Sequence, residues 1–232
     1  MSISVAMAVY NGEKHVEAQV NSILDQLKDG DEIVISYDES TDNTYKIILD
    51  LQKKNNCIKI LKGPQKGVIK NFENAILNCK NQYIFLCDQD DIWFSNKVED
   101  VLKEFQYTKA DLVIHDALIT DAKLRVIKES FFTTQKCKPG FLRNIIKNSY
   151  IGCCMAFNQE LKSKVLPFPE SIPMHDQWIG IIAELKGKVS FLKIPLMYYR
   201  RHNRNVTSIK HSDIISMIRY RIGLVKAIVK NA

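Results

Sequence analysis

The chain has 232 residues, is 46% hydrophobic and 25% charged, and carries a formal net charge of +7. This composition is typical of a folded globular protein, so it excludes intrinsic disorder and collagen-like repeats. No apolar run approaches the roughly 18 residues that span a bilayer. The basic excess favours an anionic partner, such as a phosphorylated ligand, a membrane surface or nucleic acid.

The start of the chain and its cysteines predict a cytoplasmic protein. Residues 1–10 lack the basic start and the cleavage site of a secretory signal peptide, and they predict a buried strand instead. The six cysteines show no Cys-x-x-Cys spacing. In a chain without an export signal we expect them to be reduced thiols.

The first ninety residues alternate between strand and helix patterns. Four apolar runs predict buried strands, at residues 3–9, 33–35, 58–61 and 83–87. Between them, apolar residues recur at helical spacing after turn or capping residues. This alternation predicts an α/β fold with a mostly parallel, doubly wound sheet flanked by helices. In such a sheet, ligands bind beyond the carboxyl ends of the strands.

The second half of the chain has a less regular pattern. Helical faces are predicted over residues 98–105, 141–146 and 178–185, and strands over residues 112–115, 118–119 and 152–157, with a turn at residues 121–122. Residues 131–139 show no period, so we expect a mobile loop there. We expect a single domain over residues 1–206, with halves at residues 1–95 and 96–206.

Residues 207–232 are expected to form a basic amphipathic helix. An apolar stripe over residues 214–229 alternates with Arg219, Arg221, Lys226 and Lys230. Such a helix packs on the domain with a solvated charged face, or it lies on an anionic membrane surface. Both alternatives remain open at this point.

Two groups of carboxylates follow predicted strands. Asp88, Asp90 and Asp91 come directly after the strand at residues 83–87. Three neighbouring carboxylates stay ionised together only if a cation or strong donors compensate them, and a divalent metal such as magnesium is the economical answer. The alternative is a solvated acidic turn that caps the next helix. Asp38 follows the second strand, where a carboxylate can accept hydrogen bonds from a base or a ribose, or can cap a helix.

Five segments in a fixed order resemble one enzyme family. They are residues 8–12 (AVYNG), 38–42 (DESTD), 85–93 (FLCDQDDIW), 174–178 (MHDQW) and 199–205 (YRRHNRN). Together they resemble the family-2 inverting glycosyltransferases of the GT-A fold over residues 3–206. The DQDDIW and HDxW pair is especially similar to the subgroup that builds bacterial surface polysaccharides, which includes many rhamnosyl- and glucosyltransferases.

The resemblance implies a role for each matching position. Val9 and Asn11 would line the nucleotide pocket, and Asp38 would meet the edge of a uracil or thymine base. Asp90 would be the direct ligand of the metal (Mn or Mg), and Asp88 would contact the ribose or the metal. His202 would approach the metal or the diphosphate, and Arg200 or Arg201 would meet the charge of the diphosphate. The chain departs from the family at Tyr37, where Asp is usual, and at Glu39, where Gly is usual.

Inverting transfer implies a general base, for which the resemblance indicates Asp176. The acceptor hydroxyl loses its proton as it attacks the anomeric carbon, so a carboxylate or imidazole must lie within about 3 Å of it. The alternative is that Asp176 caps the helix that follows it. Further sugar or acceptor contacts are considered at Asp91, Trp93, His115, Asp116, His175 and Trp178, with core packing as the alternative for Trp178.

The expected function is metal-dependent inverting transfer of a sugar from a UDP- or dTDP-sugar. The acceptor is expected to be a hydroxyl of a growing, lipid-linked bacterial surface glycan (O-antigen, capsule or exopolysaccharide). The enzyme is expected to reach it at the inner face of the membrane, and no nucleic-acid partner is expected. A sugar-phosphate nucleotidyltransferase is an alternative, but residues 10–13 lack its Gly-rich basic loop. A nucleotide- or anion-binding module without catalysis, including a degenerate transferase, is the other alternative.

Overall fold

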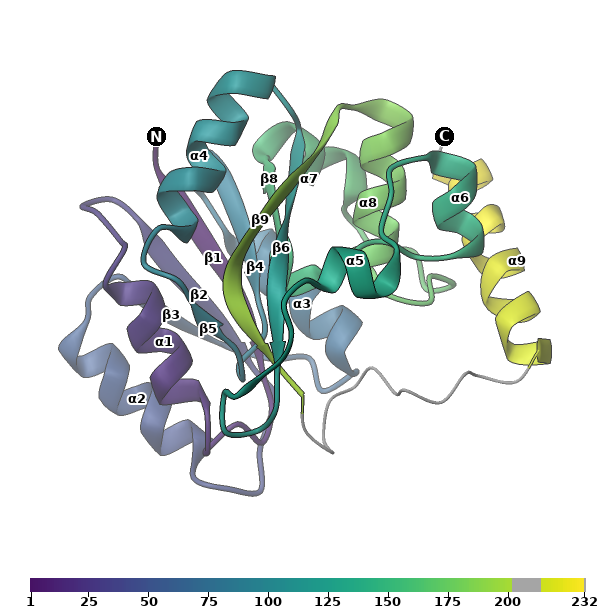
Figure 1. Cartoon of the computed structure of the whole chain (residues 1–232). Coiled ribbons are helices and arrows are strands. Elements are labelled where there is room, and N and C mark those ends of the chain that lie inside the picture. The colour runs from purple at the N-terminus through teal and green to yellow at the C-terminus, as the bar shows by residue number, and fades with distance from the viewer. Residues whose placement is uncertain (202–213, 232) are drawn as a thin grey trace.

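The computed structural model describes residues 1–201 and 214–231, so the prediction for His202 lies outside the described residues. The chain folds around one nine-stranded sheet flanked by helices (Figure 1). The strands are β1 (Ile3–Val9), β2 (Glu32–Tyr37), β3 (Ile58–Lys62), β4 (Tyr83–Cys87), β5 (Ile92–Trp93), β6 (Leu112–Thr120), β7 (Val126–Lys128), β8 (Met155–Asn158) and β9 (Val189–Arg200). The helices are α1 (Val16–Leu24), α2 (Thr44–Lys54), α3 (Val68–Asn78), α4 (Lys97–Thr108), α5 (Phe131–Gln135), α6 (Phe141–Ile146), α7 (Gln159–Val165), α8 (His175–Lys186) and α9 (Ile214–Asn231).

The strand order brings the ends of three early strands together. The sheet runs β3-β2-β1-β4-β8-β6-β9-β5, and β7 pairs with β6. Strands β1 to β4 are mutually parallel, and β6 and β9 point the same way, whereas β5, β7 and β8 point oppositely. The register pairs Val9 with Tyr37 and Met7 with Cys87. The loops after β1, β2 and β4 therefore meet at one edge of the sheet.

The central strands are apolar because helices cover both faces of the sheet. Strand β1 is buried along nearly its whole length. Helices α1 and α2 pack together on one face, and α3 packs with α8 on the other (Figure 1). The chain moves in one direction along the sheet from β1 to β3 and then returns across β2 and β1 to β4. Because such crossovers are right-handed, this reversal places α3 on the face opposite α1 and α2. This core is rigid enough to position the loops at its edge.

The second half differs in detail from the sequence predictions. Strand β6 is continuous where two short strands were expected, with register shifts beside Asp116. The segment expected as a mobile loop begins with helix α5, because the Ser130 hydroxyl caps it and the Asp116 carboxylate accepts the N–H of Phe132 at 2.9 Å. The strand expected over residues 152–157 begins as a 3₁₀ turn over Gly152–Cys154 and becomes extended only at Met155.

Candidate active site

A cavity of about 1130 Å³ lies at the carboxyl ends of β1, β2 and β4. Its lining includes Asp38, Asp90 and Asp176, so the structure brings these three residues to one cleft. The other predicted site residues along it are Val9, Asn11, Asp88 and His175. This is the position at which a parallel α/β sheet binds its ligands.

Hydrogen bonds join the loop after β1 to the loop after β2. Asn11 has a φ of 49°, a left-handed conformation that Asn tolerates better than most residues. Its N–H donates to the Ser40 hydroxyl at 2.9 Å, and its Oδ1 accepts the N–H of Thr41 at 2.8 Å. The N–H of Gly12 donates to the Thr44 hydroxyl at 2.8 Å. Ser40, Thr41 and Thr44 thus fix the loop after β1 at this side of the cleft.

Gln89, the middle residue of the DQD segment, joins the acidic turn to the loop after β1. Its Oε1 accepts the N–H of Tyr10 at 2.9 Å, and its Nε2 donates to the Tyr10 carbonyl oxygen at 2.7 Å. A Cβ on Gly12 would overlap the Gln89 amide, so the Gln89 side chain would have to move away from Tyr10. The sequence analysis did not single out Gln89, because its partners are backbone atoms of a residue 79 positions away.

Asp38 is held by the loop that follows β3. It is 7% exposed, and its Oδ1 accepts the N–H of Gln65 at 2.8 Å. The two residues that depart from the family pattern also bond within this region. The Tyr37 hydroxyl accepts the N–H of Ser40 at 2.9 Å, and Glu39 accepts from Gln65 Nε2 at 3.1 Å. Tyr37 and Glu39 therefore fit the loop without displacing Asp38.

The carboxylates after β4 lie in an environment that disfavours their charge. Burial, then the charges of Asp90 and Asp176, raise the pKa of Asp88 to about 7. Asp91 points inward: it is 1% exposed, its Oδ1 accepts the N–H of Arg200 at 2.9 Å, and burial raises its pKa well above the usual range. Ligand atoms of Asp88, Asp91 and Cys153 lie within 4.8 Å of one another. These groups disfavour one another's ionisation, and a cation bound among the carboxylates would favour their charged forms.

Arg200, at the end of β9, holds the acidic turn from the other side. Its Nε donates to the Asp90 carbonyl oxygen at 2.7 Å, and its Nη1 donates to the Ala122 carbonyl oxygen at 2.8 Å. The side chain is 6% exposed. These contacts direct the guanidinium to backbone carbonyls beside the acidic turn, and the diphosphate contact implied by the resemblance stays a prediction.

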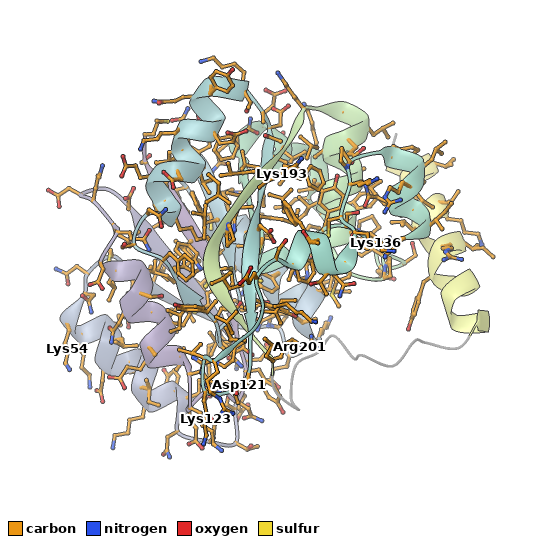
Figure 2. All side chains as sticks on the ribbon, viewed as in Figure 1. Lys54, Asp121, Lys123, Lys136, Lys193 and Arg201 are labelled. Atoms are coloured by element: carbon orange, nitrogen blue, oxygen red, sulfur yellow. The ribbon has the colours of Figure 1, made fainter. Side chains whose placement is uncertain are left out.

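Arg201 lies beside the cleft at the lower end of β9 (Figure 2). Its N–H donates to the Thr120 carbonyl oxygen at 2.9 Å, and its Nη1 donates to the Tyr199 hydroxyl at 3.1 Å. Tyr199 itself lines the cavity. Of the two arginines expected near diphosphate, Arg201 is the more exposed.

Helix α8 begins at the far wall of the cavity with His175 and Asp176. Burial raises the pKa of Asp176 to about 6, although the N–H of Gln177 donates to its Oδ1. The His175 ring stacks on Phe72 with centroids 4.1 Å apart. Among the described residues, neither of its ring nitrogens has a hydrogen-bond partner, and burial lowers its pKa to about 3. At neutral pH, Asp176 is mainly an ionised acceptor beside a neutral imidazole.

Five further predicted contacts lie away from the described lining of the cavity. They are Asp91, Trp93, His115, Asp116 and Trp178. Trp178 is 1% exposed and donates to the Val165 carbonyl oxygen at 2.9 Å, so it is a core residue, which agrees with the packing alternative. Asp116 is occupied by the N–H groups of Ala117 and Phe132 and by the Ser130 hydroxyl.

Trp93 and His115 are also part of the interior. Trp93 is 3% exposed, and the Lys97 ammonium lies 3.9 Å from its ring centroid. His115 is 1% exposed, and its Nδ1 lies 2.7 Å from the Asp116 carbonyl oxygen. Lys97, which the sequence analysis missed, is itself 1% exposed and donates to the Cys153 carbonyl oxygen. In this conformation these side chains support the cleft from beneath it.

A family model described as Glycosyl transferase family 2 matches residues 4–166. The chain belongs to this family. It is 30% identical over 238 residues to the dTDP-rhamnosyl transferase RfbG of Shigella flexneri, which covers 95% of this chain and 79% of RfbG. It is 28% identical over 216 residues to the UDP-Glc:alpha-D-GlcNAc-diphosphoundecaprenol beta-1,3-glucosyltransferase WfaP of Escherichia coli, which covers 92% of this chain and 82% of WfaP.

Other similar proteins are longer than this family-2 chain. The glycosyltransferase alr2836 of Nostoc is 27% identical over 214 residues, 88% of this chain and 66% of its own length. Staphylococcus aureus TarS 1-349 in complex with UDP-GlcNAc superposes with a TM-score of 0.74 at 21% identity, over 98% of this chain and 67% of that structure. The mannosyltransferase PcManGT of Pyrobaculum calidifontis, in complex with GDP-Man and Mn2+, superposes with a TM-score of 0.67 at 15% identity. The match covers 99% of this chain and 62% of that structure. The family and the GT-A fold expected from the sequence are confirmed.

Proposed function

We propose that this protein transfers a sugar, with inversion, from a UDP- or dTDP-sugar to a hydroxyl group of a growing bacterial surface glycan. The observation that carries the proposal is the convergence of Asp38, Asp90 and Asp176 on one cavity. These carboxylates supply a base-binding group, a metal ligand and a proton acceptor. The donors in the names of RfbG and WfaP, a dTDP- and a UDP-sugar, support the choice of nucleotide.

The donor binds along the loops after β1, β2 and β4. Val9 and Asn11 line the nucleotide pocket, and Asp38 accepts a hydrogen bond from the base. Arg201 is near enough to the cleft to meet the diphosphate charge, since its partner Tyr199 lines the cavity. His202, in the adjoining segment, is assigned to the metal or the diphosphate by the family resemblance alone.

The acidic turn fits a divalent cation, manganese or magnesium. Hard cations prefer carboxylate oxygens and retain sites for water and phosphate oxygens. Asp90 is the direct ligand and Asp88 the ribose or second metal contact, because both line the cavity. Cys153 is a poor ligand for such an ion, which favours this pair over the group with Asp91. When bound, the cation supplies a Lewis acid that stabilises the leaving diphosphate.

Asp176 is the general base. A single in-line displacement at the anomeric carbon needs the acceptor hydroxyl to lose its proton as the new bond forms. A carboxylate whose pKa is about 6 is ionised at neutral pH and more basic than an ordinary aspartate. His175 lines the same cleft, and its buried ring nitrogens have no protein partner among the described residues, which supports a bond to a sugar or acceptor hydroxyl once the ring turns toward the cleft.

The acceptor is a lipid-linked glycan at the cytoplasmic face of the membrane. WfaP is named for a diphosphoundecaprenol-linked acceptor, which supports this assignment. In the described part of the chain, no helix combines the length and apolar character needed to cross a bilayer. The enzyme would therefore reach such an acceptor from the membrane surface.

A panel of UDP-, dTDP- and GDP-sugars, screened for manganese-dependent thermal stabilisation, tests the donor assignment. We expect one UDP- or dTDP-sugar to raise the melting temperature only when manganese is present, because a ligand that binds the native state stabilises it. The same donor is then incubated with a lipid-linked acceptor, and the configuration of the product is determined. A retained anomeric configuration, or stabilisation by no nucleotide sugar, would contradict the proposal.

A further inference from the structure

Helix α9 is docked on the protein in one defined orientation. Its inner face is buried and comprises Leu224, Ala227 and Ile228. Arg221 Nη2 donates to the Ile146 carbonyl oxygen of α6 at 2.9 Å, and the Ser171 hydroxyl donates to the Gly223 carbonyl oxygen at 3.0 Å. A Cβ on Gly223 would lie 2.6 Å from the Ser171 carbonyl oxygen, so the approach is close. These contacts determine which face of α9 points outward.

The outward face of α9 is apolar. Ile222, Val225 and Val229 are 50%, 44% and 75% exposed, and their spacing places them on one stripe of the helix. The neighbouring helix α6 adds Leu142 and Ile146, which are 72% and 65% exposed. We call these five residues the outer patch. Apolar side chains gathered on adjacent helices mark an interaction surface rather than scattered exposure.

The charged residues that α9 itself carries have one sign. Residues 214–231 contain four basic residues and no acidic residue. Lys226 and Lys230 are exposed one turn apart on α9, and Lys147 is exposed directly after α6. Lys136, whose carbonyl oxygen accepts from Arg143 of α6, lies on the same side of the molecule (Figure 2). A partner that covers this surface must combine an apolar layer with negative charge.

We infer that α6 and α9 form a docking surface for an anionic phospholipid bilayer. An amphipathic helix with an apolar stripe beside lysines lies in the headgroup region, with its apolar side chains at the acyl boundary. The inner face of α9 is held by the protein, so the helix lies along the membrane rather than across it. The inference deepens the proposed function, because it supplies the surface on which a lipid-linked acceptor is reached, and it rests on that function for this purpose only.

Co-sedimentation with vesicles tests the inference directly. The whole chain is mixed with vesicles of phosphatidylcholine alone, or of phosphatidylcholine with phosphatidylglycerol, at low and high salt. We expect binding to the anionic vesicles that weakens as salt rises. Lys226→Gln with Lys230→Gln should lower the partition coefficient about 25-fold, because each lysine near an anionic surface contributes about fivefold. Val225→Asp with Val229→Asp should abolish binding.

Matched controls come from two other helices, α2 and α3. Lys46→Gln with Lys54→Gln removes the same charge from α2, which Figure 2 shows far from α9, and Leu77→Asp adds a carboxylate at an exposed apolar site on α3. Both should bind vesicles within about twofold of the parent. Equal effects of the control and test variants, or equal binding to both kinds of vesicle, would overturn the inference.

Two other occupants of the outer patch are distinguished by the same proteins. Sedimentation velocity without vesicles measures self-association: a dimer that Val225→Asp with Val229→Asp dissociates, together with an absence of vesicle binding, would assign the patch to a second copy of the chain. Manganese-dependent stabilisation by the donor is measured in parallel on every variant. Loss of vesicle binding with donor stabilisation retained separates failure of the docking surface from failure of the proposed function.

Discussion

The two sides of the cleft use their polar side chains differently. On the nucleotide side, the side chains of Asn11, Thr44 and Gln89 are bonded to backbone groups of neighbouring loops. On the opposite side, His175 has no partner among the described residues, and Asp176 keeps a raised pKa of about 6. The first set builds a fixed loop surface, whereas the second retains hydrogen-bonding capacity in a buried position.

This difference separates polar groups that stabilise the folded state from buried polar groups that destabilise it until a ligand bonds them. Buried polar groups are normally hydrogen-bonded, and those that are not raise the free energy of the folded state. In the proposed function, the loops that internal bonds hold in place present Asp38 to the donor without reorganisation. On the far wall, the His175 ring nitrogens have no partner among the described residues, and the proposed function assigns this wall to the reacting hydroxyls. Substitutions on the two sides should therefore have separable effects on donor binding, on the transfer rate and on the free energy of unfolding.

The largest effect is expected for Asp176→Asn. The amide keeps the size of the carboxylate but cannot accept the proton of the attacking hydroxyl, so the transfer rate should fall by about 10³-fold or more. Donor binding, measured by calorimetry with manganese, should stay within a few-fold of the parent. Near-normal turnover of this variant would remove Asp176 from the role of base.

The pH dependence of the parent enzyme gives an independent measurement of the same group. Asp176 must be ionised to accept a proton, and burial raises its pKa to about 6. The rate at saturating donor should therefore be constant above that value and fall about tenfold per pH unit below it. In Asp176→Asn, the residual rate should lose this acidic limb. A limb that persists unchanged would assign it to another group.

The second effect is expected for Asp90→Asn, which should abolish metal-stimulated donor binding. A neutral amide is a poor ligand for a hard cation, so the manganese concentration at half-saturation should rise about 100-fold or more. Calorimetric titration of the nucleotide at several manganese concentrations, including none, measures this metal dependence of donor binding. Asp50→Asn, a carboxylate that pairs with Lys53 on α2, is the matched control and should change nothing. An unchanged titration of Asp90→Asn would exclude Asp90 as the ligand.

Local sequence patterns were sufficient for the first half of the fold. Strands β1 to β4 are apolar runs that end at turn or acidic residues, so their positions could be predicted. Strand β9 was missed because its burial does not alternate: Lys193 and Ile194 are exposed in mid-strand, and Pro195 interrupts the pattern. A strand that crosses from an exposed edge into the core carries no single period.

The candidate site was predictable where its residues act through charge at strand ends. Asp38 follows β2 and Asp90 follows β4, whereas Asp176 lies in the first turn of α8 and was indicated by the family resemblance. All three line the cavity. Gln89 and Arg200 act instead by bonding backbone atoms of distant residues, which leave no trace in their own sequence. The family resemblance implies Arg200 or Arg201 at the diphosphate, and that role stays a prediction; the bonds of Arg200 to the Asp90 and Ala122 carbonyl oxygens are visible only in the fold.

The third effect is expected for Arg200→Lys. Lysine retains the charge, but its single ammonium cannot reach both the Asp90 and Ala122 carbonyl oxygens that the planar guanidinium contacts. The acidic turn should loosen, so the manganese requirement should rise about tenfold while the rate at saturating metal changes little. Arg201→Lys is the matched control, with a smaller expected change in metal requirement. If Arg200→Lys instead raises only the donor KM, the guanidinium acts on the diphosphate.

The smallest effect is expected for His175→Leu. This substitution should raise stability and lower the transfer rate. Leucine fills a similar volume without two nitrogens that lack protein partners among the described residues, so the free energy of unfolding should rise by about 1 kcal/mol. The transfer rate should fall about tenfold, because a hydroxyl in the cleft loses its partner. Urea denaturation and a transfer assay measure the two quantities. His175→Gln, which restores one donor and one acceptor, should recover part of the rate and lose the added stability. A variant that loses stability and rate together would show that the imidazole is bonded in solution and belongs with the structural side of the cleft.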